Sequence, residues 1–242
     1  MRARHGYSES MAPARGGYPE VAVAVDLVVL TVYEGDLHVL TVRRGSAPYT
    51  GRRALPGGFV EPDEDLHQAA RRELAEETGI RPSRAHVEQL RAYGAPKRDP
   101  RMRVVSVAHM AVVPETTEPV AGSDAAAAEW MSVDELLAAP RKLAFDHATI
   151  LRDGLERLQD SLEHTMLATR LCRAPFTVAE LREVYEVVWG DYLDPRNFHR
   201  KMTGTAGLLV DTGKVTTRNG GRPATLYRAG RLTRLNPPLT RP

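Results

Sequence analysis

Three glutamates lie close together in the first half of the chain. Glu73, Glu76 and Glu77 are spaced i, i+3 and i+4, so on a helix their carboxylates project from one face. Like charges at this spacing repel, unless a hard divalent cation such as Mg²⁺ or Mn²⁺ holds the oxygens together. Such a cation would favour a diphosphate as a further ligand. The alternative is an acidic helix face that is simply solvated, and the neighbouring residues must decide between the two.

The residues around these glutamates predict the helix that would carry them. A helical stretch from about Leu66 to Thr78 follows a loop rich in Gly and Pro at 55–58, and Gly79 is typical of a C-cap. Before the loop, two β-rich runs at 21–32 and 37–42 flank a turn and predict a hairpin. Further strands are expected at 87–92 and 104–113, and a short helix at 133–137 after a Ser132 cap.

Residues 58–80 resemble the Nudix box, which they match at nine fixed positions over 23 residues. These positions are Gly58, Glu64, Arg72, Glu73, Leu74, Glu76, Glu77, Gly79 and Ile80. The resemblance implies an α+β fold, a Nudix α/β/α sandwich, and an activity on nucleoside diphosphates linked to another group. It also implies that the three glutamates hold the cation, that Glu64 assists and that Arg72 orients a carboxylate. A helix glutamate, or a later acid such as Glu115 or Glu118, would accept the proton of the attacking water.

A second set of residues is expected to bind the ligand. Pro96 lies 16 residues beyond the box, where Nudix enzymes that accept ADP-ribose have a proline; the alternative is a proline in an ordinary loop. The cations that follow could neutralise a diphosphate or face water: Lys97, Arg98, Arg101 and Arg103. The expected ligand-binding residues are Gly57, Gly58, Arg53, Pro96, Lys97 and Arg103.

The last third of the chain has a different charge. Residues 171–242 hold 12 Lys and Arg against 6 Asp and Glu, whereas residues 1–170 hold 21 against 25, so a net charge of +2 conceals two opposite regions. A basic module beside an acidic one is typical of a nucleic-acid-binding domain fused to an unrelated domain.

The order of elements in this basic region predicts a winged helix. Thr177 and Glu180 fit a capping box for one helix, Asp194 and Pro195 begin a second, and short strands at 208–210 and 224–228 flank a turn at Asn219 to Gly221. The second helix would enter the major groove while the hairpin touches phosphates. The expected DNA-binding residues are Arg196, Asn197, His199, Arg200, Lys201, Arg218 and Arg222. Phe198 should pack inward, and the alternative is a small packing domain with a solvated basic face.

Together the two modules resemble the NrtR family of Nudix-related transcriptional regulators of NAD metabolism. The resemblance covers about residues 20–230 and includes the segments 143–147, 194–198, 200–201 and 221–224. It implies a homodimeric repressor that binds palindromic double-stranded operator DNA, acts on NAD biosynthesis genes and senses ADP-ribose. Since every acidic position of the box is present, the alternative is a Mg²⁺-dependent ADP-ribose pyrophosphatase that gives AMP and ribose 5-phosphate.

Composition sets the remaining expectations. A single cysteine, Cys172, excludes an intramolecular disulfide, and no apolar run approaches the ~18 residues of a membrane span, so we expect a cytoplasmic protein with no membrane partner. The expected division is a leader at 1–18, a Nudix domain at 19–142, a helical linker and dimer contact at 143–172, a winged helix at 173–230 and a tail at 231–242. His147 is either a contact at the dimer seam or a structural histidine.

Overall fold

A computed structural model describes residues 20–114, 128–218 and 222–241. The strands are β1 (Ala22–Tyr33), β2 (Asp36–Arg43), β3 (Arg53–Ala54), β4 (Gly57–Phe59), β5 (His86–Tyr93), β6 (Val104–Val112), β7 (Ala128–Ser132), β8 (Leu209–Thr216) and β9 (Ala224–Ala229). The α-helices are α1 (Leu66–Thr78), α2 (Val133–Ala138), α3 (His147–His164), α4 (Ala168–Leu171), α5 (Val178–Trp189) and α6 (Pro195–Gly204), with short 3-10 turns at Pro82–Arg84 and Pro140–Lys142.

A seven-stranded sheet forms the larger part of the molecule. Its main order is β3-β2-β1-β6-β5, with β4 also paired to β1 and β7 to β2. The predicted hairpin is present as the antiparallel pair of β1 and β2, and β1 runs parallel to β6. Because β1 lies in the centre of the sheet, its residues 25–32 are buried on both faces.

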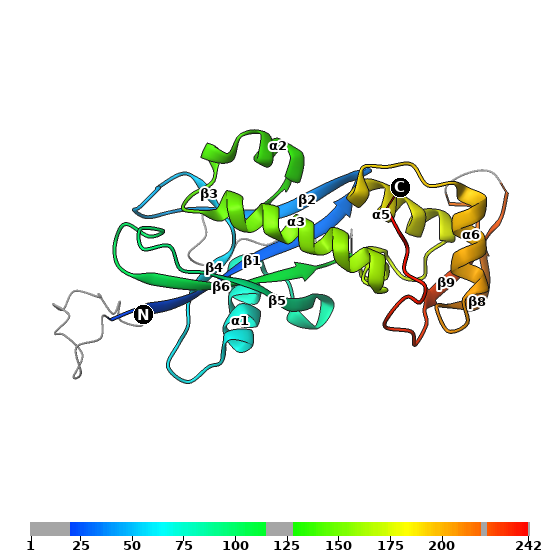
Figure 1. Ribbon diagram of the computed structural model, residues 1–242, viewed down its shortest axis with the longest axis horizontal. Helices are drawn as coiled ribbons and strands as arrows, with labels where there is room; N and C mark the ends of the chain where they lie inside the picture. The colour runs from blue at the N-terminus through cyan, green and yellow to red at the C-terminus, as the bar shows by residue number, and fades with distance from the viewer. Residues whose placement is uncertain (1–19, 115–127, 219–221, 242) are drawn as a thin grey trace.

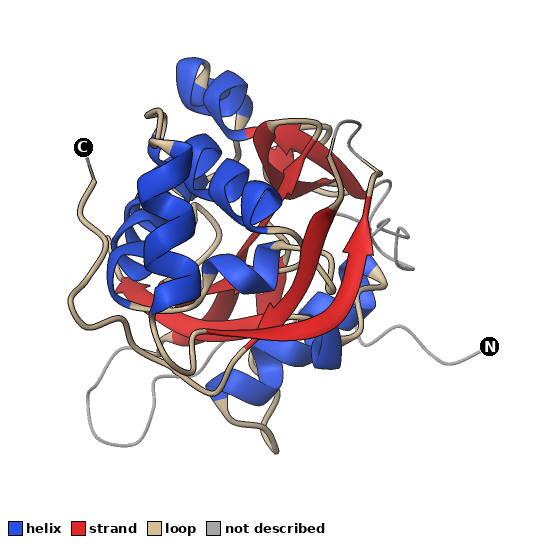
Figure 2. Ribbon diagram, turned by 90° about the vertical axis from the view of Figure 1, so that its right-hand side faces the viewer, coloured by secondary structure: helices blue, strands red, loops and turns tan. Residues whose placement is uncertain are grey.

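Alternate side chains of β1 point to opposite faces of the sheet, and each face packs against a different helix. Leu27 and Val29 belong to the cluster that contains Leu74 of α1, whereas Val28 and Leu30 belong to the cluster that contains Ile150 of α3. Figure 1 shows α1 and α3 on opposite sides of the strands, and Figure 2 shows the sheet between its helices. The result is the α/β/α sandwich expected from the box.

The range expected to be a linker contributes most of one covering helix. The apolar residues of α3 are buried within the chain, and Gly154 packs so closely on Val28 that a Cβ would collide with that side chain. The same core cluster continues through Leu158 and Leu162 to Phe176 and the winged helix. A dimer contact in this range would therefore use the other face of α3.

The winged helix follows from local signals. At α5, Thr177 and Glu180 form both bonds of the capping box, and at α6 the Asp194 side chain accepts from the Asn197 N–H while Pro195 occupies the first turn. Strands β8 and β9 pair as an antiparallel wing. Phe198 is buried 5.4 Å from the ring of Tyr185, as predicted, and Cys172 is buried as well.

Some elements differ from the sequence prediction. Strand β8 continues to Thr216, beyond the predicted 208–210, since its later residues are polar and include Gly213 at an irregular register. Strand β7 was missed because it is short and only partly buried. Ser132 is the N-cap residue of α2, as predicted, but its side chain makes no capping hydrogen bond. In the described part of the chain, no helix combines the length and the apolar character that crossing a membrane requires.

Candidate ligand pocket and DNA-binding surface

A cavity of about 390 Å³ opens at the N-terminal half of β1, next to the box. Its lining combines the glycine loop, several charged groups and two aromatic rings. The residues are Ala24, Val25, Asp26, Arg44, Ser46, Leu55, Gly57, Gly58, Phe59, Arg98, Asp99, Arg101, Val104, Phe145 and His147. Glycine is required by space at position 57, because a Cβ there would collide with the Val25 backbone carbonyl. A Cβ on Gly58 would displace the Glu73 carboxylate.

A buried polar network forms the floor of this cavity. Arg98 donates to Asp26 at 3.0 Å and to both carboxylate oxygens of Asp146, at 2.7 and 3.0 Å. Asp26 also accepts from Ser106 at 2.6 Å and lies 3.4 Å from Nε2 of His147. Burial opposes ionisation of Asp26, but His147, Arg98 and Ser106 together lower its pKa below the usual range. The carboxylate is thus held ionised beside the cavity.

His147 occupies a structural position in this network. Its Nδ1 accepts a hydrogen bond from the Leu55 backbone N–H at 2.8 Å, so Nε2 carries the proton that faces Asp26. The imidazole is only 3% exposed. Of the two roles considered from the sequence, the structure therefore supports the structural histidine, which links the start of the glycine loop to the start of α3.

Two further arginines face the cavity above this floor. Arg44 lies over the ring of Phe145 at 4.7 Å, and Arg101 pairs with Asp99 at 2.7 Å. Burial, followed by the nearby positive charge of Arg101, lowers the pKa of Arg44. An anionic ligand between them would relieve this repulsion. Arg44 was not predicted from sequence, because its place at the cavity depends on the loop that follows β2.

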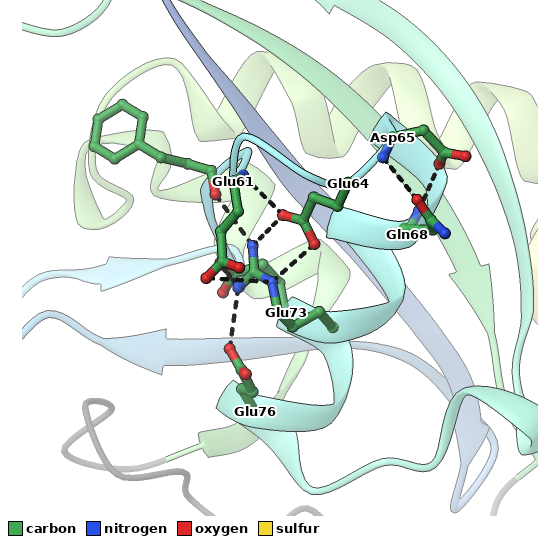
Figure 3. A network of polar contacts seen from close by, with 8 residues as sticks. Glu61, Glu64, Asp65, Gln68, Glu73 and Glu76 are labelled. Atoms are coloured by element: carbon green, nitrogen blue, oxygen red, sulfur yellow. Dashed lines mark hydrogen bonds and ion pairs between the residues drawn. The ribbon is translucent and has the colours of Figure 1, made fainter.

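The acidic face of α1 is organised around one guanidinium group. Figure 3 shows the Glu64, Glu73 and Glu76 side chains close together. Arg72 contacts these three carboxylates at 2.6, 2.7 and 3.0 Å. The hydrogen bond from Arg72 is the main reason why the pKa of Glu64 is lowered. Arg72 thereby fixes three carboxylates, and it offsets the repulsion between two of the closely spaced glutamates, Glu73 and Glu76.

Glu77 points in another direction. Its carboxylate accepts from the Gly57 N–H at 2.9 Å, and burial raises its pKa to about 7, with Glu73 and Asp26 adding to the rise. Burial also raises the pKa of Glu73, despite its contact with Arg72. Negative charge on this side of the cavity is therefore incompletely neutralised, which favours binding of a cation.

The oxygen donors on α1 fit the chemistry of a hard divalent cation. In residues 20–114, 128–218 and 222–241, however, no three acidic, histidine or cysteine side chains are gathered as a metal site. Glu73 and Glu76 face Arg72 while Glu77 faces Gly57, so these contacts would have to be exchanged for the cation. Glu115 and Glu118, considered as bases, lie outside the described residues.

The predicted ligand-binding residues are only partly brought together. Gly57 and Gly58 line the cavity, but Pro96 and Lys97 are exposed and do not. Arg103 donates to the Gly94 carbonyl at 2.7 Å, and Arg53 pairs with Glu129 of β7 at 2.8 Å, so neither faces the cavity. Two residues of the basic segment after Pro96, Arg98 and Arg101, do line the cavity.

The basic face of the winged helix centres on α6. Arg196, Asn197, His199 and Arg200 are all exposed on this helix, while Phe198 and Met202 face the core. The Asn197 side chain accepts from Arg200 at 2.9 Å. Arginine and asparagine are the side chains that make paired hydrogen bonds to guanine and adenine edges. The exposed face of α6 therefore carries side chains of the types that pair with base edges.

The other predicted DNA-binding residues have different surroundings. Lys201 donates to the Pro238 carbonyl at 2.7 Å, so its ammonium group is engaged within the chain. Arg218 pairs with Glu180 of α5 at 2.7 Å, which ties the end of β8 to that helix. Arg222 is exposed beside the wing, and the turn at 219–221 lies outside the described residues. The sequence alone did not reveal the contact of Lys201 with Pro238 or that of Arg218 with Glu180.

Known proteins share both parts of this architecture. The chain matches the family model of the NUDIX domain over residues 22–154 and that of the NrtR DNA-binding winged helix domain over residues 168–229. It is 33% identical over 216 residues to the ADPR responsive transcriptional repressor NtrR of Acinetobacter baylyi, covering 88% of this chain and 84% of that protein. It is 40% identical over 136 residues to the ADP-ribose pyrophosphatase of Methanocaldococcus jannaschii, covering 56% and 74%.

A solved structure resembles the whole arrangement. The chain superposes with a TM-score of 0.76 and 34% identity on Shewanella oneidensis NrtR complexed with a 27mer DNA, covering 86% of this chain and 93% of that one. The likeness thus includes the sandwich and the winged helix together. The chain belongs to the NrtR family, in which a Nudix domain is followed by an NrtR winged helix domain.

Proposed function

We propose that this protein is an ADP-ribose-responsive transcriptional repressor. One observation carries the proposal: a single chain joins an arginine-lined cavity beside a Nudix box to a winged helix whose second helix exposes base-reading side chains. The Acinetobacter relative is described as a repressor responsive to the same ligand, and the Shewanella relative was crystallised with DNA.

The cavity suits a nucleoside diphosphate sugar. Arg44, Arg98 and Arg101 supply positive charge for the diphosphate, and the Phe145 and Phe59 side chains supply apolar surface. The volume of about 390 Å³ lies within the range of small-molecule sites. ADP-ribose matches this chemistry, and the Methanocaldococcus relative is an ADP-ribose pyrophosphatase.

The exposed face of α6 would lie in the major groove, with the wing near the phosphates. A homodimer would place two such helices on a palindromic operator, for which we propose the control regions of NAD biosynthesis genes. Such a protein would act in the cytoplasm. The test is a fluorescence anisotropy titration of operator DNA with and without ADP-ribose, in which the ligand should weaken DNA binding.

A second function is favoured by the intact box. Hydrolysis of ADP-ribose to AMP and ribose 5-phosphate would use Mg²⁺ or Mn²⁺ held by Glu73, Glu76 and Glu77, and that cation would polarise the diphosphate and acidify a water. Glu77 would bind this cation as a carboxylate, in place of the proton that its pKa of about 7 lets it keep near neutral pH in the metal-free protein. The three arginines would hold the diphosphate during this reaction.

Chromatographic detection of AMP decides whether hydrolysis matters. Protein, Mg²⁺ and ADP-ribose are incubated, with Glu77→Gln as the matched inactive variant. Turnover above about 1 per second would establish an enzyme, whereas a rate below about 0.01 per second would assign the pocket to sensing alone. A slow rate between these limits would fit a repressor that gradually removes its own signal.

A further inference from the structure

The C-terminal segment 231–241 is a structural part of the molecule. We call it the strap; it begins beyond the winged helix match at 168–229, and the sequence predicted only a tail there. Leu235 and Leu239 are each 8% exposed and join the main core cluster. In Figure 1 the strap, drawn in red, returns from β9 toward α3 and α5.

The strap is bound along the last turns of α3. The Leu235 and Leu239 N–H groups donate to the carbonyls of His164 and Glu163 at 2.8 and 2.9 Å. The Arg241 guanidinium then reaches three acceptors on the same helix: Glu163 at 2.7 Å, Asp160 at 2.9 Å and Gln159 at 3.1 Å. A guanidinium with three acceptors on one helix fixes direction as well as distance.

The same strap also holds the DNA-binding side. Lys201 of α6 donates to the Pro238 carbonyl at 2.7 Å, and the Leu232 N–H donates to the Gly207 carbonyl between α6 and β8 at 3.0 Å. Gln159 of α3 additionally donates to the Val188 carbonyl of α5 at 2.9 Å and accepts from Trp189 at 3.2 Å. The helix that reads DNA is thus attached to α3 through the strap and through α5.

The other end of α3 starts at the cavity. Asp146 immediately precedes the helix, and its carboxylate accepts two hydrogen bonds from Arg98 in the cavity floor. A ligand phosphate that binds Arg98 competes directly with Asp146 for the same N–H groups. Any resulting shift at the start of α3 can reach the strap, because one continuous helix, His147–His164, joins the cavity to the residues that bind the strap.

We propose that the strap fastens the recognition helix to α3, so that occupancy of the cavity changes the position of α6 relative to the Nudix domain. Arg241 is the positioning residue of this connection, and it acts through α3. The inference rests on the proposed ligand-dependent DNA binding, and it adds the route by which the ligand acts.

Arg241→Ala tests the connection in the full-length protein. DNA Kd is measured with and without saturating ADP-ribose, and the ratio of the two is compared among variants. If the wild-type ratio is about tenfold, typical of allosteric coupling, Arg241→Ala should reduce it to about twofold while ADP-ribose affinity stays unchanged. Arg241→Lys, which keeps the charge but not the three-way contact, should retain an intermediate ratio.

The matched control is Arg234→Ala, which removes the same charge from the strap. No hydrogen bond of the Arg234 side chain occurs within the described ranges, although its backbone bridges to Thr165. Equal ratios for Arg241→Ala, Arg234→Ala and the wild type would overturn the inference while leaving the proposed function intact. A wild-type ratio of one would instead refute the proposed function.

Hydrogen exchange of the ligand-free protein tests the fastening step by itself. Arg241→Ala should accelerate exchange of the Leu235 and Leu239 amides and of the last turn of α6, by about tenfold or more, at unchanged Tm. Faster exchange confined to the strap, or no acceleration at all, would show that the strap does not hold α6. This measurement is decisive whatever the ligand does to DNA binding.

Discussion

The ligand pocket and the recognition helix use charge in opposite ways. In the pocket, Arg98 is buried between Asp26 and Asp146, and on α1 Arg72 gathers three carboxylates. On α6, by contrast, Arg196 and Arg200 are exposed to solvent. The contrast shows that an enclosed anion site must neutralise its own charges when empty, whereas a surface for DNA can leave cations hydrated until the phosphates arrive.

The largest effect should come from breaking the buried network. Arg98→Ala would leave Asp26 and Asp146 without their shared cation, and should destabilise the protein by about 3–5 kcal/mol in urea denaturation. Arg91→Ala removes an exposed partner of Asp153 and should cost less than about 1 kcal/mol. Similar losses for both variants would contradict the distinction between buried and exposed charges.

The second effect concerns pH. The folded pKa of Glu77, about 7, lies above its ordinary value of 4.5, so between these values the folded protein keeps a proton that the unfolded chain has released. The stability of the metal-free wild type should therefore fall as pH rises through this window. Glu77→Gln should remove this loss of stability. It should raise the free energy of unfolding by about 2–3 kcal/mol at pH 8, but change it little at pH 4.

Chemical denaturation in chelator at both pH values checks this prediction. Glu76→Gln, which removes an exposed carboxylate from the same helix, serves as the control and should change stability by about 0.5 kcal/mol or less. A gain for Glu77→Gln that is equal at both pH values would reject the electrostatic explanation. Glu77→Gln should also weaken Mg²⁺ binding, so this substitution would raise the stability of the protein while lowering its affinity for the cation.

On α6, Arg200→Ala should weaken DNA binding and leave the stability of the protein unchanged. If Arg200 contacts a base, the free energy of DNA binding weakens by about 1–3 kcal/mol, roughly 5- to 160-fold in Kd, with an unchanged urea midpoint. Arg81→Ala removes an exposed charge from the Nudix domain and controls for the general loss of positive charge. Equal losses of DNA affinity in both variants would mean that α6 contributes only net charge.

The smallest effects test helix capping. Asp194→Ala removes the side chain that accepts from the Asn197 N–H and should lower stability by about 1 kcal/mol. Ser132→Ala should cost less, about 0.5 kcal/mol or below, because Ser132 forms no such bond. Thermal unfolding of the two variants in parallel would show whether capping, rather than residue type, determines the loss.

The sequence predicted local structure well because its signals are local. The bounds of α1, its Gly79 cap and the capping box of α5 follow from residues within one or two turns. The composition of the cavity depends on contacts across the fold, such as Arg98 with Asp146, 48 residues apart, and these have no local signal. For the same reason the sequence did not reveal that Arg53 pairs with Glu129 or that Lys201 donates to the Pro238 carbonyl.

The central claim is that the Nudix pocket controls DNA binding by the winged helix. It is tested most directly by the Kd of the full-length protein for operator DNA at fixed salt, measured across a titration of ADP-ribose with Mg²⁺ omitted to prevent turnover. The account predicts that DNA affinity falls about tenfold as the pocket fills, with a midpoint equal to the Kd for ADP-ribose. A DNA affinity that stays constant while ADP-ribose saturates the pocket would contradict it.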